Sequence, residues 1–177
     1  AVVDATHPFA SRMTAHAVAA TAATGVPLLV LRRPGWPPVP GWAWVDSLPA
    51  AAALLPSLGQ RVFLTIGRTG LAAFAGSDLE FLVRCVDPPE PPLPPRRRVI
   101  LVRGPFTVDG ERALLREHRI DVLVTKDSGG TATSPKLVAA RAEGVQVVVQ
   151  RRPAPPVGVD VVETVGAALA WIRTRRS

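Results

Sequence analysis

The feature that most constrains the fold of this chain is its alternation of short apolar runs with helix-forming stretches. Short runs rich in valine, leucine and isoleucine are typical of strands that are buried on both faces of a parallel sheet. The expected strands are 1–5, 27–31, 42–45, 61–67, 81–86, 99–102, 122–124 and 145–149. Helical stretches separate most of them, which is the pattern of right-handed β-α-β crossovers. The sequence therefore predicts an α/β protein with parallel sheets.

The strands fall into two series, and Gly59-Gln60 makes a plausible boundary between them. We therefore expect two Rossmann-like domains, residues 1–58 and residues 59–177. A parallel strand like the one that opens the first series is normally interior to a sheet, so we expect this domain to lack an earlier segment. The last helix is expected over 163–175.

Capping residues set the expected starts of several helices. A Ser, Thr or Asp side chain can accept a hydrogen bond from a free N–H group of the first turn, and proline is well tolerated there. These signals place Thr6 before the first helix, Ser47 before the second and Asp109 before a later one. A further short helix is expected over 68–74.

Composition narrows the classes of function. The chain has 177 residues and a net charge of +7, which is carried almost entirely by arginine. The planar guanidinium group suits phosphates and carboxylates, so an acidic ligand is one interpretation and nucleic acid is another. Tyrosine is absent and no alternation of aromatic and basic residues occurs, which disfavours binding of single-stranded nucleic acid.

Several classes of site lack their sequence patterns. The single cysteine, Cys85, excludes an intramolecular disulfide, and the three histidines lie on different elements without metal-ligand spacing. Neither a G-x-S-x-G elbow nor a G-x-x-x-x-G-K-[ST] loop occurs. No apolar run is long enough to span a bilayer, and no charged-then-apolar leader opens the sequence. We therefore expect no metal, no membrane contact and a cytoplasmic location.

Polar and basic residues follow the expected strands at the points where the strands end. In a parallel sheet the carboxyl ends of the strands share one edge, and ligands bind there. The donors at these points are Thr6-His7, Arg32-Arg33, Thr65 with Gly67-Arg68-Thr69, Arg103-Gly104, Thr125 to Gly130 and Arg151-Arg152. Such donors suit an anion, for example a nucleotide phosphate or a polycarboxylate.

The most informative segment is Val122 to Gly130, an apolar strand that passes directly into the sequence TKDSGG. Gly129 and Gly130 can adopt backbone angles closed to other residues, and can therefore bring N–H groups close to an anion. Ser134 and Pro135 then predict the start of a helix. The alternative is that this glycine pair only turns the chain.

Three residues are candidates for a direct chemical role, namely Lys126, Ser128 and His7. At a strand exit His7 could donate to a ligand, or it could simply cap or pack against the following helix. Asp127 could exchange a proton, although a role in binding nearby loop N–H groups is at least as consistent with its position. The residues alone do not assign a catalytic group.

Five motifs in this order resemble the precorrin-6A reductase family of cobalamin biosynthesis, and the resemblance spans nearly the whole chain. They are DATHPFA at 4–10, LTIGR at 64–68, RGPF at 103–106, TKDSGG at 125–130 with KL at 136–137 and AAR at 139–141, and RRP at 151–153. The family also opens with a strand and a G-G-T-x-E-A loop that has no match here. The first Rossmann-like domain is thus expected to lack its N-terminal glycine-rich βα unit.

The resemblance implies an enzyme that uses NADPH, or NADH, to reduce one double bond of the precorrin-6A macrocycle and give precorrin-6B. It also implies two Rossmann-like domains with the site in the cleft between them. Expected cofactor contacts are Thr125, Lys126, Ser128, Gly129, Gly130 and Arg68. Expected substrate contacts are Thr6, His7, Arg103 and Arg151. The family motif admits asparagine in place of Asp127, so this carboxylate is not expected to be an obligatory proton donor.

The expected partner is the tetrapyrrole substrate, without nucleic acid or membrane, and the chain is expected to be a monomer or a weak oligomer. A second hypothesis is a non-catalytic Rossmann-like module that binds a nucleotide or an acidic metabolite without turnover. Nucleic-acid binding through the positive charge ranks third, and it predicts an affinity that falls steeply with salt.

Overall fold

The computed structural model describes residues 1–175 and contains two compact units, each built on its own sheet. The first unit comprises Ala1–Trp36, Ser128–Gly130 and the chain from Arg152 onward. The second comprises Pro37–Asp127 and Thr131–Arg151. Every strand pair in both sheets is parallel, which confirms the predicted α/β class with Rossmann-like parallel sheets.

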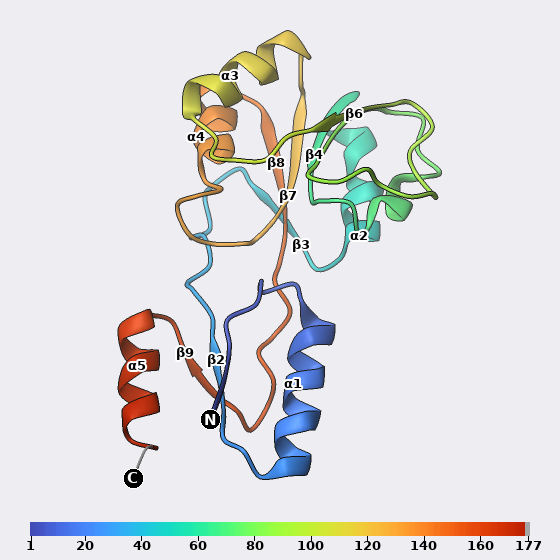
Figure 1. Ribbon diagram of the computed structural model, residues 1–177. Coiled ribbons are helices and arrows are strands. Elements are labelled where there is room, and N and C mark those ends of the chain that lie inside the picture. The colour runs from blue at the N-terminus through green and yellow to red at the C-terminus, as the bar shows by residue number, and fades with distance from the viewer. Residues whose placement is uncertain (176–177) are drawn as a thin grey trace. The chain divides into compact units, whose positions relative to one another are not determined.

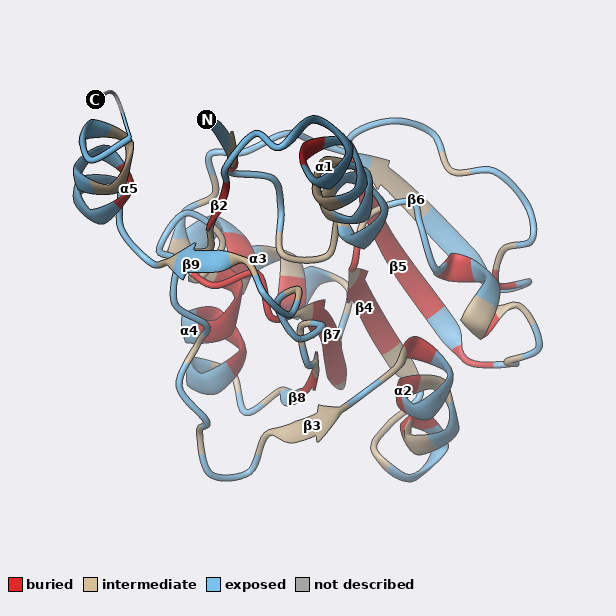
Figure 2. Ribbon diagram, turned by 90° about the horizontal axis from the view of Figure 1, so that it is seen from below, coloured by how far each residue is buried: buried red, intermediate tan, exposed pale blue. Residues whose placement is uncertain are grey.

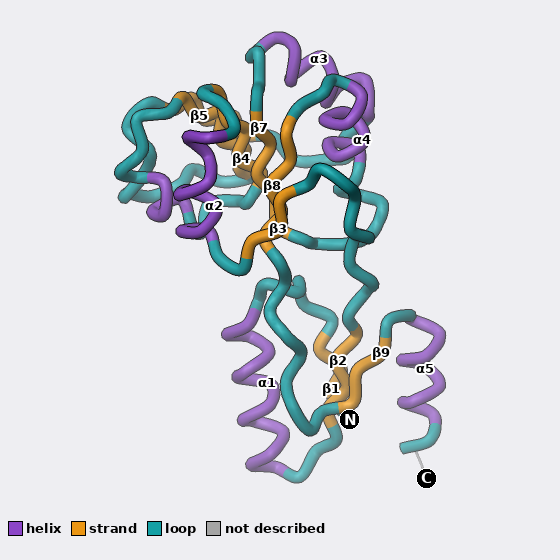
Figure 3. The backbone as a smooth tube through the Cα atoms, turned by 180° about the vertical axis from the view of Figure 1, so that it is seen from behind, coloured by secondary structure: helices purple, strands orange, loops and turns teal. Residues whose placement is uncertain are grey.

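The first unit is a three-stranded sheet with one helix on each side (Figures 1 and 3). Its strands lie in the order β1 (Val2–Asp4), β2 (Leu28–Leu31) and β9 (Asp160–Val162), and its helices are α1 (Ser11–Thr24) and α5 (Val165–Arg173). Helix α1 ends at Gly25, whose φ of 66° is the left-handed conformation typical of a helix stop. The strands are short, so this sheet offers a small surface to either helix.

The start of α1 differs from the sequence prediction. Thr6 does not cap it, because the Asp4 carboxylate accepts the backbone N–H of Thr6 at 2.9 Å and holds the chain at the strand exit. The helix begins only at Ser11, and the residue before it, Ala10, provides no side-chain cap. The DATHPFA motif therefore forms an exit loop in which the Asp4 side chain fixes the backbone.

The expected boundary between residues 58 and 59 does not coincide with the division between the two units. Strand β9 is only three residues long and was missed in the sequence, yet it pairs with β2 and places α5 in the first unit. Conversely, β3 (Ala43–Val45) pairs with β8, so residues 37–58 belong to the second unit. Pairing between strands far apart in sequence leaves no local signal.

The second unit is a six-stranded sheet with helices on both faces (Figure 3). Its order is β3-β8-β7-β4-β5-β6, in which β4 is Arg61–Thr65, β5 is Glu80–Cys85, β6 is Arg97–Leu101, β7 is Val122–Lys126 and β8 is Gln146–Gln150. One face carries α2 (Leu48–Leu54) and the 3₁₀ helices η1 (Leu55–Ser57) and η2 (Leu71–Phe74). The other carries α3 (Val108–Glu117) and α4 (Pro135–Ala142).

Local capping chemistry explains where these helices begin. Ser47 accepts the N–H of Ala50 at 3.2 Å and caps α2, as predicted. Helix α3 is instead capped by Thr107, which accepts the N–H of Gly110 at 3.1 Å, so the prediction of Asp109 was two residues late. The helix expected over 68–74 is reduced to η2, which follows Gly70 with its φ of 96°.

The core of the second unit consists of aliphatic and aromatic side chains from the central strands, and Figure 2 shows β4 and most of β5 as buried. On the α2 face Val62, Leu64 and Val124 pack with Leu71 and Phe74. Burial of each such side chain stabilises the fold by about 1.5–3 kcal/mol. This core fixes the ends of the strands, where the candidate site lies. Within the described residues no helix is long and apolar enough to cross a membrane.

Candidate functional site

The candidate site of the second unit lies at the carboxyl edge of its sheet, where the strand order reverses. Strand β4 neighbours both β5 and β7, so the chain proceeds through β5 and β6 on one side and through β7 and β8 on the other. In an open parallel sheet a reversal of this kind leaves a ligand-binding crevice beyond the ends of the two neighbouring strands. Here those strands are β4 and β7.

The exit of β4 carries three features suited to an anionic ligand. Thr65 pairs in register with Thr125 of β7, and its hydroxyl donates to the carbonyl oxygen of Val124 at 3.1 Å. Gly67 has a φ of 77°, and the space that a Cβ atom would occupy there is open. The exposed Arg68 guanidinium forms no hydrogen bond or ion pair with residues 1–175. It is therefore available to a phosphate or a carboxylate.

The exit of β7 places a partly desolvated cation on the strand next to β4. Burial lowers the pKa of Lys126, because the charged ammonium group loses part of its hydration. The Thr125 side chain is only 1% exposed, and its hydroxyl donates to the carbonyl oxygen of Lys126 at 3.4 Å. Asp127 is also buried, and its N–H donates to the carbonyl oxygen of Gln150 at 2.9 Å. Thr125 and Asp127 thus shape the exit, while Lys126 supplies its charge.

The two other predicted arginines of the second unit differ in their surroundings. Arg103 is exposed after β6 and has no hydrogen bond or ion pair with the described residues. Arg151 follows β8, where its NH1 group donates to the carbonyl oxygen of Trp44 at 3.0 Å and to the Asp46 carboxylate at 3.1 Å. Part of the hydrogen-bonding capacity of Arg151 is therefore already used within the fold, whereas that of Arg103 is not.

The glycine loop Ser128–Gly130 belongs to the first unit, where its carbonyl oxygens are held by side chains from the exit of β2. Arg33 Nε donates to the carbonyl oxygen of Ser128 at 2.6 Å, and Trp36 Nε1 donates to that of Gly130 at 3.0 Å. Arg152 in turn donates to the carbonyl oxygen of Arg33 at 2.7 Å. Arg33 and Arg152, which the sequence suggested as anion contacts, therefore support the loop.

Close packing, which the sequence did not reveal, explains why position 129 is glycine. Its φ is 63°, and a Cβ atom there would lie directly on the carbonyl oxygen of Pro34 and 2.7 Å from the Arg152 guanidinium. The residue is buried, whereas Gly130 is exposed. Close approach of the loop to its own chain therefore demands glycine at 129, independently of any ligand.

Thr6 and His7 line a cavity of 240 Å³ at the carboxyl ends of β1 and β2, together with Asp4, Thr14 and Arg32. His7 Nδ1 accepts the backbone N–H of Phe9 at 3.2 Å, so a neutral His7 carries its proton on Nε2. The sequence prediction that these two residues meet at a strand exit is confirmed in geometry. Their contact with a substrate stays a prediction.

Asp4 organises this cavity and was not predicted as a site residue. Its carboxylate accepts the Thr14 hydroxyl at 2.6 Å as well as the Thr6 N–H group. Burial alone would raise the pKa of Asp4, but the hydrogen bonds from Thr14 and Thr6 outweigh it and leave the pKa below its usual value. Asp4 is therefore a buried anion that orders the loop carrying Thr6 and His7.

A second group missed in the sequence is a buried charged cluster between β5, α3 and α4. Arg84 NH1 and Glu111 Oε1 lie 2.5 Å apart, and the Arg84 guanidinium stacks 4.0 Å from the centre of the Phe106 ring. Lys136 is 6% exposed; its burial and the nearby Arg84 charge lower its pKa to about 8, although Glu111 opposes this shift. The sequence did contain one sign of this cluster, because Arg84 interrupts the apolar run FLVRCV. The cluster holds the RGPF motif through Phe106.

These surroundings fit a dinucleotide and an acidic substrate in their chemistry. The switch point combines an open glycine, an exposed guanidinium and a partly buried ammonium group, all of which favour negative charge. The arrangement can bind and orient anions, as cofactor-dependent chemistry requires.

Comparisons with known proteins agree with one another. The family model of the precorrin-6x reductases CbiJ/CobK matches residues 1–173. A precorrin-6A reductase of Rhodococcus erythropolis is 54% identical over 177 residues, which cover 98% of this chain and 71% of that protein. One from Mycobacterium tuberculosis H37Rv is 50% identical over 173 residues, covering 97% and 71%. A solved structure of CobK precorrin-6A reductase matches with a TM-score of 0.90 at 44% identity, covering 99% of this chain and 73% of that one.

Proposed function

The chain belongs to the precorrin-6x reductase family of oxidoreductases, and we propose that it reduces one double bond of precorrin-6A in cobalamin biosynthesis. The hydride donor is a nicotinamide cofactor, NADPH, and the product is precorrin-6B. The observation that carries this proposal is the position of the family's motifs: LTIGR and the first residues of TKDSGG, Thr125 and Lys126, lie at the switch point between β4 and β7.

In the proposed cofactor site, Lys126 and Arg68 bind the phosphates. A partly buried ammonium group attracts an anion more strongly than an exposed one, because less water screens the interaction. The open space at Gly67 lets a ligand approach the backbone closely. Thr125 supports the exit from within the sheet, and Ser128, Gly129 and Gly130 of the first unit are further proposed cofactor contacts.

NADPH is proposed in preference to NADH because of Arg68. The 2′-phosphate that distinguishes NADPH is commonly bound by an arginine near the switch point. Arg68 is exposed there and has no partner among residues 1–175. Replacing it with glutamine should therefore raise the KM for NADPH much more than the KM for NADH. Equal changes in both constants would contradict this assignment.

Precorrin-6A carries several carboxylates, which the remaining donors are proposed to bind. Arg103 offers a guanidinium without a partner in the described chain, and Arg151 can add the N–H groups not used by Asp46 and Trp44. Thr6 and His7 line the cavity of the first unit and are the proposed substrate contacts there. These contacts would orient the macrocycle rather than react with it.

The chemistry follows from positioning. A bound nicotinamide would supply the hydride, and water or a carboxyl group of the substrate would supply the proton, so no protein nucleophile is needed. The residues of this chain fix distance and orientation, which alone can lower a barrier by several kcal/mol. Lys126, Ser128 and His7 are the side chains proposed to lie nearest the reacting groups.

The test is consumption of NADPH in the presence of precorrin-6A. Lys126→Gln should raise the KM for NADPH by about tenfold, the loss of ~1.4 kcal/mol of binding. Arg12→Gln, an exposed arginine of α1 with no contact among the described residues, is the control and should behave like the parent chain. Binding of NADPH with no turnover would favour a non-catalytic module instead. If Lys126→Gln matched the parent, the placement of the cofactor would be wrong.

A further inference from the structure

A second basic cavity lies at the opposite edge of the six-stranded sheet, at the amino ends of β4, β5 and β6. Its volume is 350 Å³, and the charged groups that line it are Arg61, Glu80, Arg96, Arg97, Arg98 and His118. All strands of the sheet are parallel, so this edge is the far end from the switch point. None of the five motifs discussed above contributes to it.

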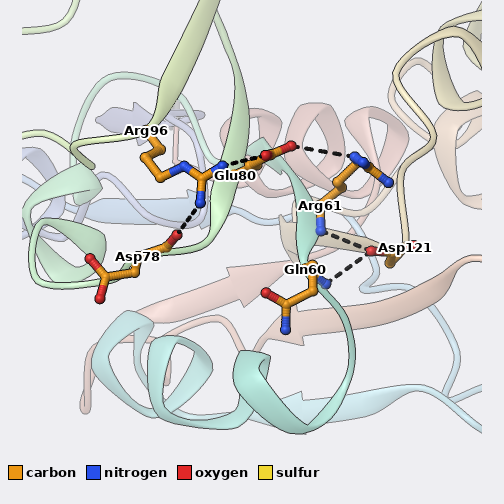
Figure 4. Close-up of polar contacts among 6 residues, drawn as sticks. All are labelled: Gln60, Arg61, Asp78, Glu80, Arg96 and Asp121. Carbon is orange, nitrogen blue, oxygen red and sulfur yellow. Dashed lines mark hydrogen bonds and ion pairs between the residues drawn. The ribbon is translucent and has the colours of Figure 1, made fainter.

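The cavity is organised before any ligand binds (Figure 4). The Glu80 carboxylate lies between two arginines, 3.3 Å from Arg61 Nε and 2.5 Å from Arg96 NH2. Arg96 NH1 also donates to the carbonyl oxygen of Asp78 at 3.4 Å. Asp121 accepts the backbone N–H groups of Gln60 and Arg61 at 2.9 and 2.8 Å, which fixes the turn that carries Arg61.

The positive charge of the cavity exceeds what the fold neutralises. Glu80 is the one carboxylate that lines it, and both of its oxygens are already shared by Arg61 and Arg96. Arg97 donates only to a neutral carbonyl oxygen, that of Pro94, at 2.8 Å. The exposed Arg98 side chain has no hydrogen bond or ion pair with residues 1–175. The guanidinium groups of Arg97 and Arg98, both of which line the cavity, therefore have no carboxylate partner among the described residues.

The bottom of the cavity is apolar. Phe81, Leu82 and Ile120 line it, and all three are buried. A cavity of this size falls at the lower end of the range for small-molecule sites, roughly 300–1,000 Å³. Apolar surface combined with a rim of guanidinium groups suits a small organic molecule that carries negative charge at one end.

We propose that this cavity binds a small molecule bearing a multivalent oxyanion, either a phosphate ester or a polycarboxylate. Arg97 and Arg98 bind the oxyanion, because a guanidinium group offers parallel N–H donors that match two oxygens of one phosphate or carboxylate. Glu80 keeps Arg61 and Arg96 at the rim.

The test is calorimetric titration of the chain with inorganic pyrophosphate and, separately, with citrate, at ionic strength held constant with sodium chloride. Saturable binding of at least one anion is expected. In the double variant Arg97→Gln/Arg98→Gln that binding should weaken by about tenfold or more. Arg141→Gln is the matched control, an exposed arginine in the last turn of α4, and should bind as the parent does. Whichever anion binds more tightly distinguishes a phosphate ligand from a carboxylate ligand.

Pyrophosphate can also reach the proposed cofactor site, so Lys126→Gln is titrated in parallel. Binding that survives in this variant and is lost in the double variant supports the second site. Binding lost in Lys126→Gln but kept in the double variant, equal weakening in Arg141→Gln, or no saturable binding of either anion would overturn it. Arg98→Gln alone replaces the double variant if the latter does not fold, because the Arg98 side chain is exposed and makes no hydrogen bond or ion pair with the described residues.

Discussion

Different interactions stabilise each of the two units internally. The second buries an extended apolar core on both faces of its sheet, as Figure 2 shows for β4 and β5. Among the described residues of the first unit, the buried apolar side chains are Leu28, Leu29, Val30 and Ala168, and the polar Asp4 and Thr21 are buried beside them. The second unit is thus a rigid scaffold for strand exits, whereas the first depends on individual polar contacts to shape its loops.

The largest expected effect is the loss of unfolding free energy when a core side chain is truncated, and it should be greater in the second unit than in the first. Phe74→Ala should destabilise the second unit by about 3–5 kcal/mol, because the ring is fully buried and packs 5.8 Å from Phe81. Leu29→Ala in the first unit should cost less, about 2–3 kcal/mol, since fewer apolar neighbours surround the cavity left behind. Urea unfolding of the two variants measures both values. An equal or larger loss for Leu29→Ala would remove the distinction between the units.

The next largest effect is the loss of stability when a glycine with a positive φ is replaced by alanine. Gly129→Ala should cost about 1–3 kcal/mol from overpacking against Pro34, in addition to ~1 kcal/mol for the left-handed backbone. Gly144→Ala in the second unit is the matched control, because its φ is 69° but its Cβ would meet open space. Only Gly129→Ala should also weaken NADPH binding in a fluorescence titration. Similar losses of stability in both variants would mean that contact with Pro34 is unimportant.

One buried charged residue in each unit should make the free energy of unfolding depend on pH, Asp4 in the acidic range and Lys136 in the alkaline range. The folded pKa of Asp4 is lowered, so its stabilising effect is present above its unfolded value of 3.8 and is lost as the pH falls through the folded value. Asp4→Asn should therefore cost about 1.5–3 kcal/mol near neutral pH, and less in acid.

Lys136 acts in the alkaline range, where stability again rises with pH, but here because a destabilising buried charge is lost. Its folded pKa of about 8 lies below its ordinary value of 10.5, so the parent chain should gain stability as the pH rises from 8 toward 10.5. Lys136→Met should be at least as stable as the parent at neutral pH, and this difference should shrink in that range. Thermal unfolding over a pH series measures both variants. A pH-independent difference in either pair would contradict the assigned charge state.

The smallest effect compares two helix caps. Thr164 accepts the N–H of Ala167 at 3.1 Å and caps α5, as Ser47 caps α2. Replacing either by alanine should cost about 1 kcal/mol of unfolding free energy. The loss from Thr164→Ala should be confined to the first unit, which hydrogen exchange of α5 can detect. Exchange that rises equally in β4 would indicate that the two units unfold together.

Much of the second unit could be predicted from its sequence. Each of its central strands is a continuous apolar run, and period and composition alone locate such runs. The strand before TKDSGG was predicted, because Val122 to Val124 form a buried apolar run, but β7 continues through Thr125 and Lys126, so the exit begins two residues later than predicted. Family motifs then identified the family, which the comparisons confirm.

The rest depended on contacts between distant parts of the chain. Strand β9 and the division between the units arise from pairing of residues more than 100 positions apart, such as Val30 with Val161. The support of the glycine loop by Arg33 and Trp36 also joins segments far apart in sequence. From position alone an arginine at a strand exit is equally consistent with binding a ligand or a carbonyl oxygen.

The central claim is that the switch point of the second unit binds the nicotinamide cofactor. A crystal structure of the chain with NADP⁺ tests it most directly. The predicted result places the cofactor phosphates against the carboxyl ends of β4 and β7, within hydrogen-bonding distance of Lys126 or of the backbone at Gly67-Arg68. Phosphates bound at the amino edge of that sheet, or away from β4 and β7 altogether, would contradict it.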